Sequence, residues 1–422
     1  MCVILLLLTL FSGLAQQASS PDSLLINVDH RKVTSLNGDW PIIVDPFENG
    51  YYDYRYKPRR DGYFMDAKPK NKSDLVEYDF VDTDVLHVPG DWNTQRPKLF
   101  FYEGTIWYKK SFRYDLKPGR RLFLYFGAAN YEAHVYLNGK QLGMHTGGFT
   151  PFQFEITKDL KPGENTIVVK VDNKRHKDGV PTLNTDWWNY GGLTRRVLLV
   201  ETPSTFVRSY SVQLDPDNSK DIKGWVQLDG SDLSQKVKLR IPEARTTRVI
   251  TTDTRGYGSF TVKTNLKKWS PEHPKLYDVQ LIEGSDTLHD DIGFRTIKVD
   301  GTQILLNGKP IFLRGISIHE EAPMRGGRAY SREDDRTLLT WAKELDCNYV
   351  RLAHYPHNEA MLREADKMGL LVWSEIPVYW TVQFDNPYTY KLASQQLTEE
   401  ITRDRNRASI IIWSVGNETP RS

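Results

Sequence analysis

The chain has 422 residues and a formal net charge of +2 at pH 7. At roughly 100–200 residues per domain, this length predicts two to four domains. The near-neutral charge, with no basic stripe in the sequence, argues against a nucleic-acid or acidic-membrane partner. Aromatic residues make up 12% of the chain, which favours a β-rich protein that can also stack rings against ligands.

The N-terminal sequence MCVILLLLTLFSGLAQQ has the pattern of a secretory signal. Its apolar run, from Val3 to Phe11, is too short to span a bilayer, and small residues suitable for cleavage follow it. We therefore expect residues 1–18 to be a signal peptide and expect no contact with a membrane. Cleavage would leave Cys347 as the only cysteine, so no internal disulfide is expected. Export without disulfides favours a secreted or bacterial periplasmic location.

Residues 22–203 alternate short strands with turns and show no helical period of useful length. In HVYLNGKQLG, Val135 and Leu137 alternate with His134 and Tyr136, and the following Asn-Gly pair is typical of a two-residue hairpin turn. This pattern predicts an antiparallel jelly roll. Residues 204–298 contain further short strands, such as GWVQLDG and KVKLRI, at a spacing that indicates an immunoglobulin-like sandwich.

From residue 299 onward, predicted strands alternate with predicted helices. The strands are KPIFLRGIS, NYVRLAHYP, LLVWSEIP and SIIIWSVGNE. The helices between them are SREDDRTLLTWAKEL, NEAMLREADKMG and LASQQLTEEITRDR. Apolar strands in this order predict parallel βαβ units, and residues 299–422 are expected to form the first half of a (β/α)8 barrel.

The predicted helices carry recognisable end signals. Ser331 is expected to cap the first helix, with an Asp in place of the usual Glu or Gln of a capping box. Leu338, Ala342 and Leu345 are expected to share its apolar face. Asn358 is expected to begin the second helix, which closes at a glycine.

Polar side chains follow the carboxyl ends of all the predicted strands in this segment. In chain order they are His319 and Glu320, then Arg351 and His354, then Glu375, and finally Asn417 and Glu418. A single Glu at a strand end is usually a helix cap or a solvated loop residue, and a single His is more often a core group. In a parallel barrel, however, this rim holds the active site. Successive strands that all deliver such groups therefore favour a functional site.

A rim of carboxylates and aromatic rings suits glycoside hydrolysis. That reaction needs a protonated carboxyl to donate to the leaving oxygen and a second carboxylate to attack or to activate water. The donor must keep its proton near neutral pH, so its surroundings must disfavour ionisation. Glu418 follows an apolar strand that contains Trp413, and this neighbourhood is compatible with the demand. Asn417 can donate an amide hydrogen bond to a sugar hydroxyl.

Over essentially its whole mature length, the sequence resembles glycoside hydrolase family 2, and especially the β-glucuronidase-like branch. LNGDW, GTIWYKKSF, VYLNGKQLGMHTGGFTPF and DWWNYGGLTRRV resemble the sugar-binding jelly roll of that family. LLNGKPIFLRGISIHEEAPMRG resembles the entry into its barrel. VRLAHYPHNEAMLREADKMGLLVWSEIP and RDRNRASIIIWSVGNE resemble the next three barrel strands, and their final Asn-Glu pair is the acid/base signature of the family.

The resemblance implies a role for each matching residue. Glu418 would be the general acid/base, and Asn417 would bind the sugar 2-hydroxyl. Arg351 would support the nucleophile electrostatically. The remaining candidates would line the sugar subsite or support it: His354 and His319 as subsite residues, Asp186 reaching in from the jelly roll, and Glu375 as a supporting carboxylate. In some relatives the counterpart of this last carboxylate helps to hold magnesium, but here no metal and no cofactor is expected.

The resemblance also implies that the nucleophilic Glu lies beyond residue 422, near the end of the seventh barrel strand. The residues that read a substrate carboxylate would lie there too. We therefore expect this chain to be a piece of a longer enzyme and to lack retaining activity by itself. Glu375 and Glu320 lie on the same predicted rim, but the family pattern makes neither of them the nucleophile. The full-length protein could form a homo-oligomer.

Three alternatives remain open at this point. β-Galactosidase, β-mannosidase and β-galacturonidase belong to the same class as the favoured β-glucuronidase. A non-catalytic carbohydrate-binding protein would also explain the jelly roll. Metal-dependent hydrolysis is the weakest alternative, because Pro356 interrupts any helix between His354 and His357 and no His-Glu-x-x-His spacing is present.

Overall fold

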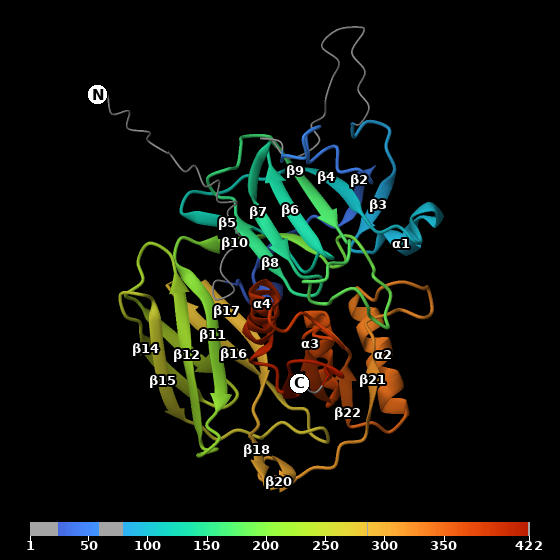
Figure 1. Ribbon diagram of the computed structural model, residues 1–422. Helices are drawn as coiled ribbons and strands as arrows, with labels where there is room; N and C mark the ends of the chain where they lie inside the picture. Colours follow the sequence, from blue (N-terminus) through green and yellow to red (C-terminus); the bar gives the residue numbers. More distant parts are fainter. Residues whose placement is uncertain (1–23, 59–78, 285, 421–422) are drawn as a thin grey trace, which may run out of the picture.

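The computed structural model describes residues 24–58, 79–284 and 286–420. The predicted signal peptide lies outside these residues. In Figure 1 a layer of antiparallel strands lies at the top, with a second β-sandwich and a helix-covered parallel sheet side by side beneath it. Within the described ranges, none of the helices has the length and apolarity needed to cross a bilayer.

Two antiparallel sheets form the jelly roll at the top of Figure 1. The six-stranded sheet has the order β3 (Val85–Val88), β2 (Gly38–Asp45), β4 (Thr105–Arg113), β9 (Glu164–Asp172), β6 (Glu132–Leu137), β7 (Lys140–Thr146). The four-stranded sheet has the order β1 (Lys32–Ser35), β10 (Val197–Pro203), β5 (Arg120–Phe126), β8 (Phe152–Glu155). The short helix η2 (Val28–His30) precedes β1, and α1 (Trp92–Gln95) and η3 (Pro97–Leu99) lie between β3 and β4. Apolar side chains from both sheets share one buried core, as a jelly roll requires.

The β6–β7 hairpin confirms the predicted turn, and both faces of β6 are buried. Asn138 and the glycine after it both have positive φ, at 53° and 85°, as a type I′ turn requires. Val135 is buried in the core between the sheets, as expected. His134 and Tyr136, on the opposite face of the strand, are buried as well. The reason is a second apolar cluster, which includes Trp107 and covers the opposite face of this sheet.

A second sandwich follows, with an immunoglobulin-like arrangement. One sheet has the order β11 (Phe206–Leu214), β12 (Asp221–Asp229), β15 (Tyr257–Lys263). The other has the order β14 (Thr246–Thr251), β13 (Lys236–Ile241), β16 (Leu276–Glu283), β17 (Asp286–Gly293). Apolar side chains from both sheets again form one buried cluster.

A small antiparallel sheet, β18 (Ile297–Asp300), β19 (Gln303–Leu306) and β20 (Lys309–Pro310), leads into the last part of the chain. There a parallel sheet has the order β21 (Gly315–Ile318), β22 (Tyr349–Leu352), β23 (Leu371–Glu375), β24 (Ile410–Ser414). The connecting helices are α2 (Arg332–Glu344), α3 (Glu359–Met368) and α4 (Pro387–Asp404). This strand order and parallel pairing confirm the predicted partial TIM barrel.

The helix caps agree with the sequence, and two details of the helices differ. Ser331 and Asp334 form the capping box, and Asn358 caps α3. Leu345 is 65% exposed instead of sharing the apolar face of α2, because that helix ends one residue earlier. The helix α4 begins at Pro387, five residues before the predicted start at residue 392, because Asn386 caps it there.

The predicted strand KPIFLRGIS is divided in two. Its first residues, in β20, pair with the antiparallel strand β19, whereas β21 pairs in parallel with β22. The small sheet ends with a 3.0 Å hydrogen bond from the Ile311 N–H to the Ile304 carbonyl, just after β20. The chain enters the barrel segment only at Gly315.

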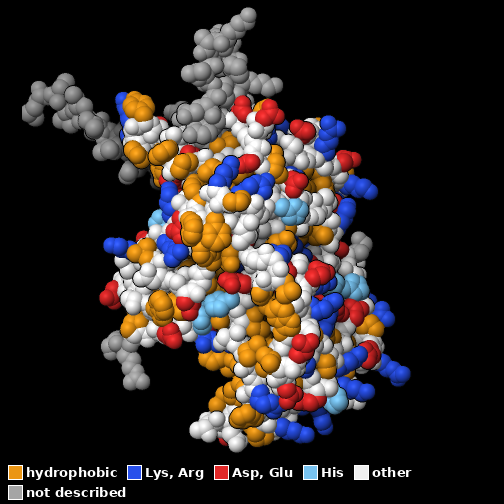
Figure 2. All heavy atoms as spheres, turned by 90° about the vertical axis from the view of Figure 1, so that its right-hand side faces the viewer, with side chains coloured by type: hydrophobic (Ala, Val, Ile, Leu, Met, Phe, Trp, Pro, Cys, Tyr) orange, Lys and Arg blue, Asp and Glu red, His pale blue; other side chains and the backbone are white. Residues whose placement is uncertain are grey.

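The jelly roll is joined to α4 by buried polar contacts. The Glu399 carboxylate lies 3.1 Å from Nε2 of His145 and accepts a 2.6 Å hydrogen bond from the Thr150 hydroxyl. Gln396 donates a 2.7 Å bond to the carbonyl of Val180. These contacts place α4 directly beneath the jelly-roll strands (Figure 1). On the face shown in Figure 2, basic and acidic side chains are interspersed, as the near-neutral composition led us to expect.

Candidate active site

The carboxyl ends of the parallel strands bring the predicted side chains to one rim. β22 carries Arg351 and leads to His354, β23 ends on Glu375, and β24 leads to Asn417. Because neighbouring strands in this sheet run in the same direction, the residues that follow each strand emerge on the same side. The structure therefore assembles groups that are separated by up to 66 residues in sequence.

Arg351 connects three of the four strands at this rim. Its guanidinium donates hydrogen bonds of 2.8 and 2.9 Å to the two carboxylate oxygens of Glu375. It also donates a 2.7 Å bond to the side-chain oxygen of Asn417. The amide of Asn417 is thereby oriented with its oxygen toward the arginine, which leaves its NH₂ group available as a donor.

Glu375 is fully buried and makes three polar contacts. His354 lies 2.6 Å away through Nδ1, and the indole of Trp373 donates a 3.0 Å bond. Burial by itself would raise the pKa of this carboxyl, but hydrogen bonds from His354 and Arg351 outweigh it and the pKa is lowered. Glu375 is therefore an ionised partner that orients its neighbours, which suits a supporting carboxylate better than a proton donor.

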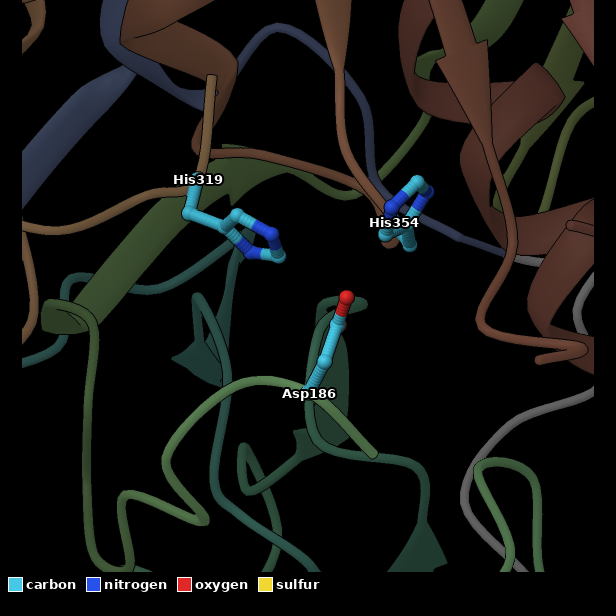
Figure 3. Close-up of side chains that lie close together, drawn as sticks. All are labelled: Asp186, His319 and His354. Atoms are coloured by element: carbon cyan, nitrogen blue, oxygen red, sulfur yellow. The ribbon is translucent and has the colours of Figure 1, made fainter. Parts of the chain in front are cut away.

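Asp186 reaches this rim from the long loop between β9 and β10 of the jelly roll. Its carboxylate and the rings of His319 and His354 offer ligand atoms that all lie within 4.8 Å of one another. Figure 3 shows the three side chains pointing into a common space. Burial and the neighbouring His354 lower the pKa of His319. Its ring is therefore neutral at neutral pH and can donate or accept a hydrogen bond.

An aromatic wall beside this cluster was not predicted from the sequence. Trp187 is almost buried, and its ring lies 5.0 Å from that of Tyr379 and 5.2 Å from that of Tyr355. Tyr379 also hydrogen-bonds the Asp186 carboxylate, and burial together with this bond raises the pKa of Tyr379. Trp187 was visible within DWWNYGG, but Tyr379 lies in a loop after β23 and no local pattern marks it.

Glu418 is held differently from the other rim residues. Its carboxylate accepts a 2.8 Å hydrogen bond from the indole of Trp380, and its backbone has a φ of 49°. The side chain is exposed to solvent, so the apolar shielding expected near Trp413 is not provided by the described residues. The acid/base role of Glu418 stays a prediction.

Glu320 does not lie on the rim with the others, although the sequence placed it there. Its carboxylate is fully buried between Arg195 and Arg328, at 3.0 and 2.6 Å. Burial would raise the pKa of this carboxyl, but the attraction of both arginines is stronger and lowers the pKa to about 2. His357 is buried too, and its ring lies 3.1 Å from a backbone carbonyl. Both residues are structural partners.

The fold and this rim correspond to one family of carbohydrate-active enzymes. Residues 33–203 match the sugar binding domain of the glycosyl hydrolases family 2, and residues 297–422 match the TIM barrel domain of that family. Residues 205–295 match a further model described as glycosyl hydrolases family 2. The chain therefore belongs to glycosyl hydrolase family 2, as its resemblance indicated.

Relatives by sequence include both glucuronidases and galactosidases. The chain is 32% identical to a β-galactosidase of Thermoanaerobacter pseudethanolicus over 82% of its own length and 50% of that protein. It is 30% identical to the β-glucuronidase of Rattus norvegicus over 79% of its length and 57% of that protein. A protein of Formosa agariphila, provisionally named a β-glucuronidase, is 33% identical over 79% of the chain and 42% of that protein. The chain thus spans about half the length of these curated relatives.

Solved structures of similar fold include β-glucuronidases. One is the Bifidobacterium dentium β-glucuronidase complexed with coumarin-3-O-glucuronide, with a TM-score of 0.78 and 25% identity over 93% of this chain and 69% of that one. Another is the Ruminococcus gnavus β-glucuronidase in complex with D-glucaro-d-lactam, with a TM-score of 0.77 and 25% identity over 95% and 69%.

Proposed function

We propose that this chain carries the acid/base half of the active site of a retaining exo-β-glycosidase. We propose further that the substrate of that enzyme is a β-glucuronide. The observation that supports this most is that Arg351, His354, Glu375 and Asn417 converge at one rim. Asp186 reaches the same rim from the jelly-roll loop between β9 and β10. Hydrogen-bond donors and acceptors of this kind, beside an aromatic wall, suit the hydroxyls and flat faces of a pyranose ring.

In the proposed mechanism, Glu418 protonates the glycosidic oxygen as the bond breaks. A second carboxylate attacks the anomeric carbon, and Glu418 then removes a proton from the water that releases the sugar. Asn417, held by Arg351, donates to the hydroxyl beside the scissile bond. The family resemblance places the attacking carboxylate beyond residue 422, so we expect the 422-residue chain alone to bind sugar without turnover.

The test begins with the nucleotide sequence that follows codon 422. The product of the full reading frame is assayed with 4-nitrophenyl β-glucuronide, β-galactoside and β-mannoside. We expect the glucuronide to have the highest kcat/KM. A preference for the galactoside would instead support β-galactosidase, which is the name of the Thermoanaerobacter relative.

The acid/base assignment is tested with Glu418→Gln in the same protein. Loss of a general acid should slow hydrolysis of a methyl β-glucuronide by about 10²–10⁴-fold. The nitrophenyl substrate should be affected less, because its leaving group departs without protonation. Glu333→Gln, at an exposed position in α2, is the matched control. Unchanged hydrolysis of the methyl glucuronide by Glu418→Gln would contradict the assignment.

We also propose that the protein is exported to the periplasm or the medium. The short apolar N-terminal run and the small residues after it support this. N-terminal sequencing of the protein recovered from its natural source should begin after residue 18. A mature protein that still begins with the initiating methionine would overturn the proposal.

A further inference from the structure

A groove crosses the outer face of the three-stranded sheet in the second sandwich. Its volume is about 660 Å³, and it extends from Gln213 on β11, over Trp225 on β12, to Thr261 on β15. The described residues that line it include none of those at the active-site rim. In Figure 1 the strands that carry the groove lie to the left of the parallel sheet. We propose that this groove is a second saccharide-binding site, separate from the active site, which takes an anionic sugar chain such as an oligouronate.

The alternation of β12 and the register of its neighbours shape the groove. Val226 is buried in the core of the sandwich, so the adjacent Trp225 points to the opposite face of the sheet. Trp225 is paired with Ser211 on β11 and with Ser259 on β15. Small side chains therefore flank the indole on both sides and leave space above the sheet.

The lining combines hydroxyl groups with an aromatic ring. The hydroxyls of Ser211, Ser259 and Thr261 make no hydrogen bond to another residue in the described ranges, so they are available to a ligand. Trp225 supplies apolar surface, and the guanidinium of Arg405, 5.0 Å from the ring centroid, fixes its orientation. A few polar groups beside an aromatic ring suit the hydroxyls and C–H groups of a sugar.

The charge of the groove selects the kind of sugar. Two cations, Lys223 and Arg248, line it together with no carboxylate from the described part of the chain. Lys223 is paired with Asp215 at 2.7 Å, whereas the exposed Arg248 has no ion-pair partner among the described residues. A planar guanidinium can bind a carboxylate through two parallel hydrogen bonds. The groove therefore favours a sugar that carries a carboxylate, whichever sugar the active site cleaves.

Other occupants fit the groove less well. A partner protein that adds a strand needs an open sheet edge. This groove lies on a sheet face, and the edge strand β11 is already contacted by Asn406, whose side chain accepts a 3.0 Å hydrogen bond from the N–H of Val212. Single-stranded nucleic acid needs cations along its whole backbone. Here Arg248 is the one lining cation without an ion pair within the described ranges.

The test is isothermal titration calorimetry of the untagged 422-residue chain with a hexameric oligoglucuronate. Saturating methyl β-D-glucuronide is present throughout, so that the rim is occupied. We expect one-site binding that Arg248→Ala weakens about tenfold and Trp225→Ala roughly fivefold. The control is Arg240→Ala, which changes an exposed arginine on the other sheet of the same sandwich and should bind as the wild-type chain does.

An uncharged hexamer of glucose separates the contribution of charge from that of the ring, and it should bind about tenfold more weakly. Because Arg248 is exposed, its variant should fold even if Trp225→Ala does not, and circular dichroism checks both. Three results would each overturn the proposal: no binding of the oligoglucuronate, equal affinity in the wild-type chain and Arg248→Ala, or equal affinity for the two hexamers.

Tighter binding of single-stranded DNA, or a dimer in sedimentation velocity that Trp225→Ala dissociates, would identify another occupant and overturn it as well. Because the rim is occupied in every titration, a failure here is distinct from a failure of the proposed catalytic function.

Discussion

Arg195 and Glu320 lie 125 residues apart in sequence and form a fully buried ion pair between the jelly roll and the barrel segment. Arg328 completes the pair from the other side. A buried pair of this kind need not stabilise the fold relative to apolar residues, but removal of one partner leaves an uncompensated charge. The contact therefore makes the barrel segment depend on the jelly roll.

The first prediction concerns Glu320→Gln, which should lower the free energy of unfolding by about 3–5 kcal/mol at pH 7 because two buried arginines lose their counter-charge. The pKa of Glu320 is about 2 in the folded chain, below the ordinary value of 4.5. Its stabilising contribution is therefore present above pH 4.5 and is lost as the pH falls toward 2. Urea denaturation should show the difference from wild type shrinking over that range. A difference that does not change with pH would contradict the assignment.

The second prediction concerns Glu400, whose effect on stability changes with pH in the direction opposite to that of Glu320. Glu400 is a buried residue of α4, and its carboxyl accepts a hydrogen bond from Ser374. Burial raises the pKa of Glu400 from 4.5 to about 8. The folded state therefore keeps this proton, and the stability that it supplies is full below pH 4.5 and lost as the pH rises through 8.

Glu400→Gln resembles the protonated form and should remove this pH dependence. We expect similar stability to wild type near pH 5 and a gain of a few kcal/mol above pH 8, at ~1.4 kcal/mol per pKa unit. Thermal denaturation across this pH range provides the measurement. Glu344→Gln, at the exposed end of α2, should show no such trend. A Gln variant that is less stable than wild type at pH 8.5 would refute the prediction.

The third prediction tests Arg351 as the residue that positions Asn417. Arg351→Lys keeps the charge but cannot reproduce the fork that contacts Glu375 and Asn417 together. A hydrogen bond to a charged group contributes roughly 1.5–3 kcal/mol, so binding of methyl β-D-glucuronide to the chain should weaken about tenfold or more. Titration followed by NMR measures this. Arg336→Lys, on the exposed face of α2, is the control; equal affinity in both variants would contradict the positioning role.

The fourth prediction concerns Gly369, which ends α3 with a φ of 69°. A Cβ at this position would lie 2.3 Å from the carbonyl oxygen of Pro271. Gly369→Ala therefore combines an unfavourable backbone conformation, at roughly 1–2 kcal/mol, with a clash against backbone atoms that cannot rotate away. We expect a larger loss of stability than the conformation alone explains.

Gly301→Ala separates these two contributions. Gly301 has a similar φ of 58°, but a Cβ there would meet nothing within 4 Å. Chemical denaturation should show a clearly smaller loss for this variant than for Gly369→Ala. Equal losses would mean that the contact with Pro271 costs nothing.

Much of the fold around the site could be predicted, because the residues at its helix ends carry local signals. Ser331, Asn358 and Gly369 mark helix ends through hydrogen bonds and backbone angles within a few residues, and all three behave as expected. The order of strands and helices follows from apolar patterns of similar range. Polar residues directly after parallel strands share a rim, so the neighbourhood of Arg351 and Glu375 followed from topology.

Other features depended on partners that are distant in the chain. Glu320 and Glu375 have similar sequence settings, yet only tertiary packing pairs the first with Arg195 and leaves the second at the rim. The sequence by itself therefore determined the order of most elements, the caps of α2 and α3, and the family resemblance. Only the tertiary structure decided which carboxylate lies at the rim and that Asp186 meets the two histidines, because burial, charge pairing and side-chain geometry arise from contacts that no local pattern encodes.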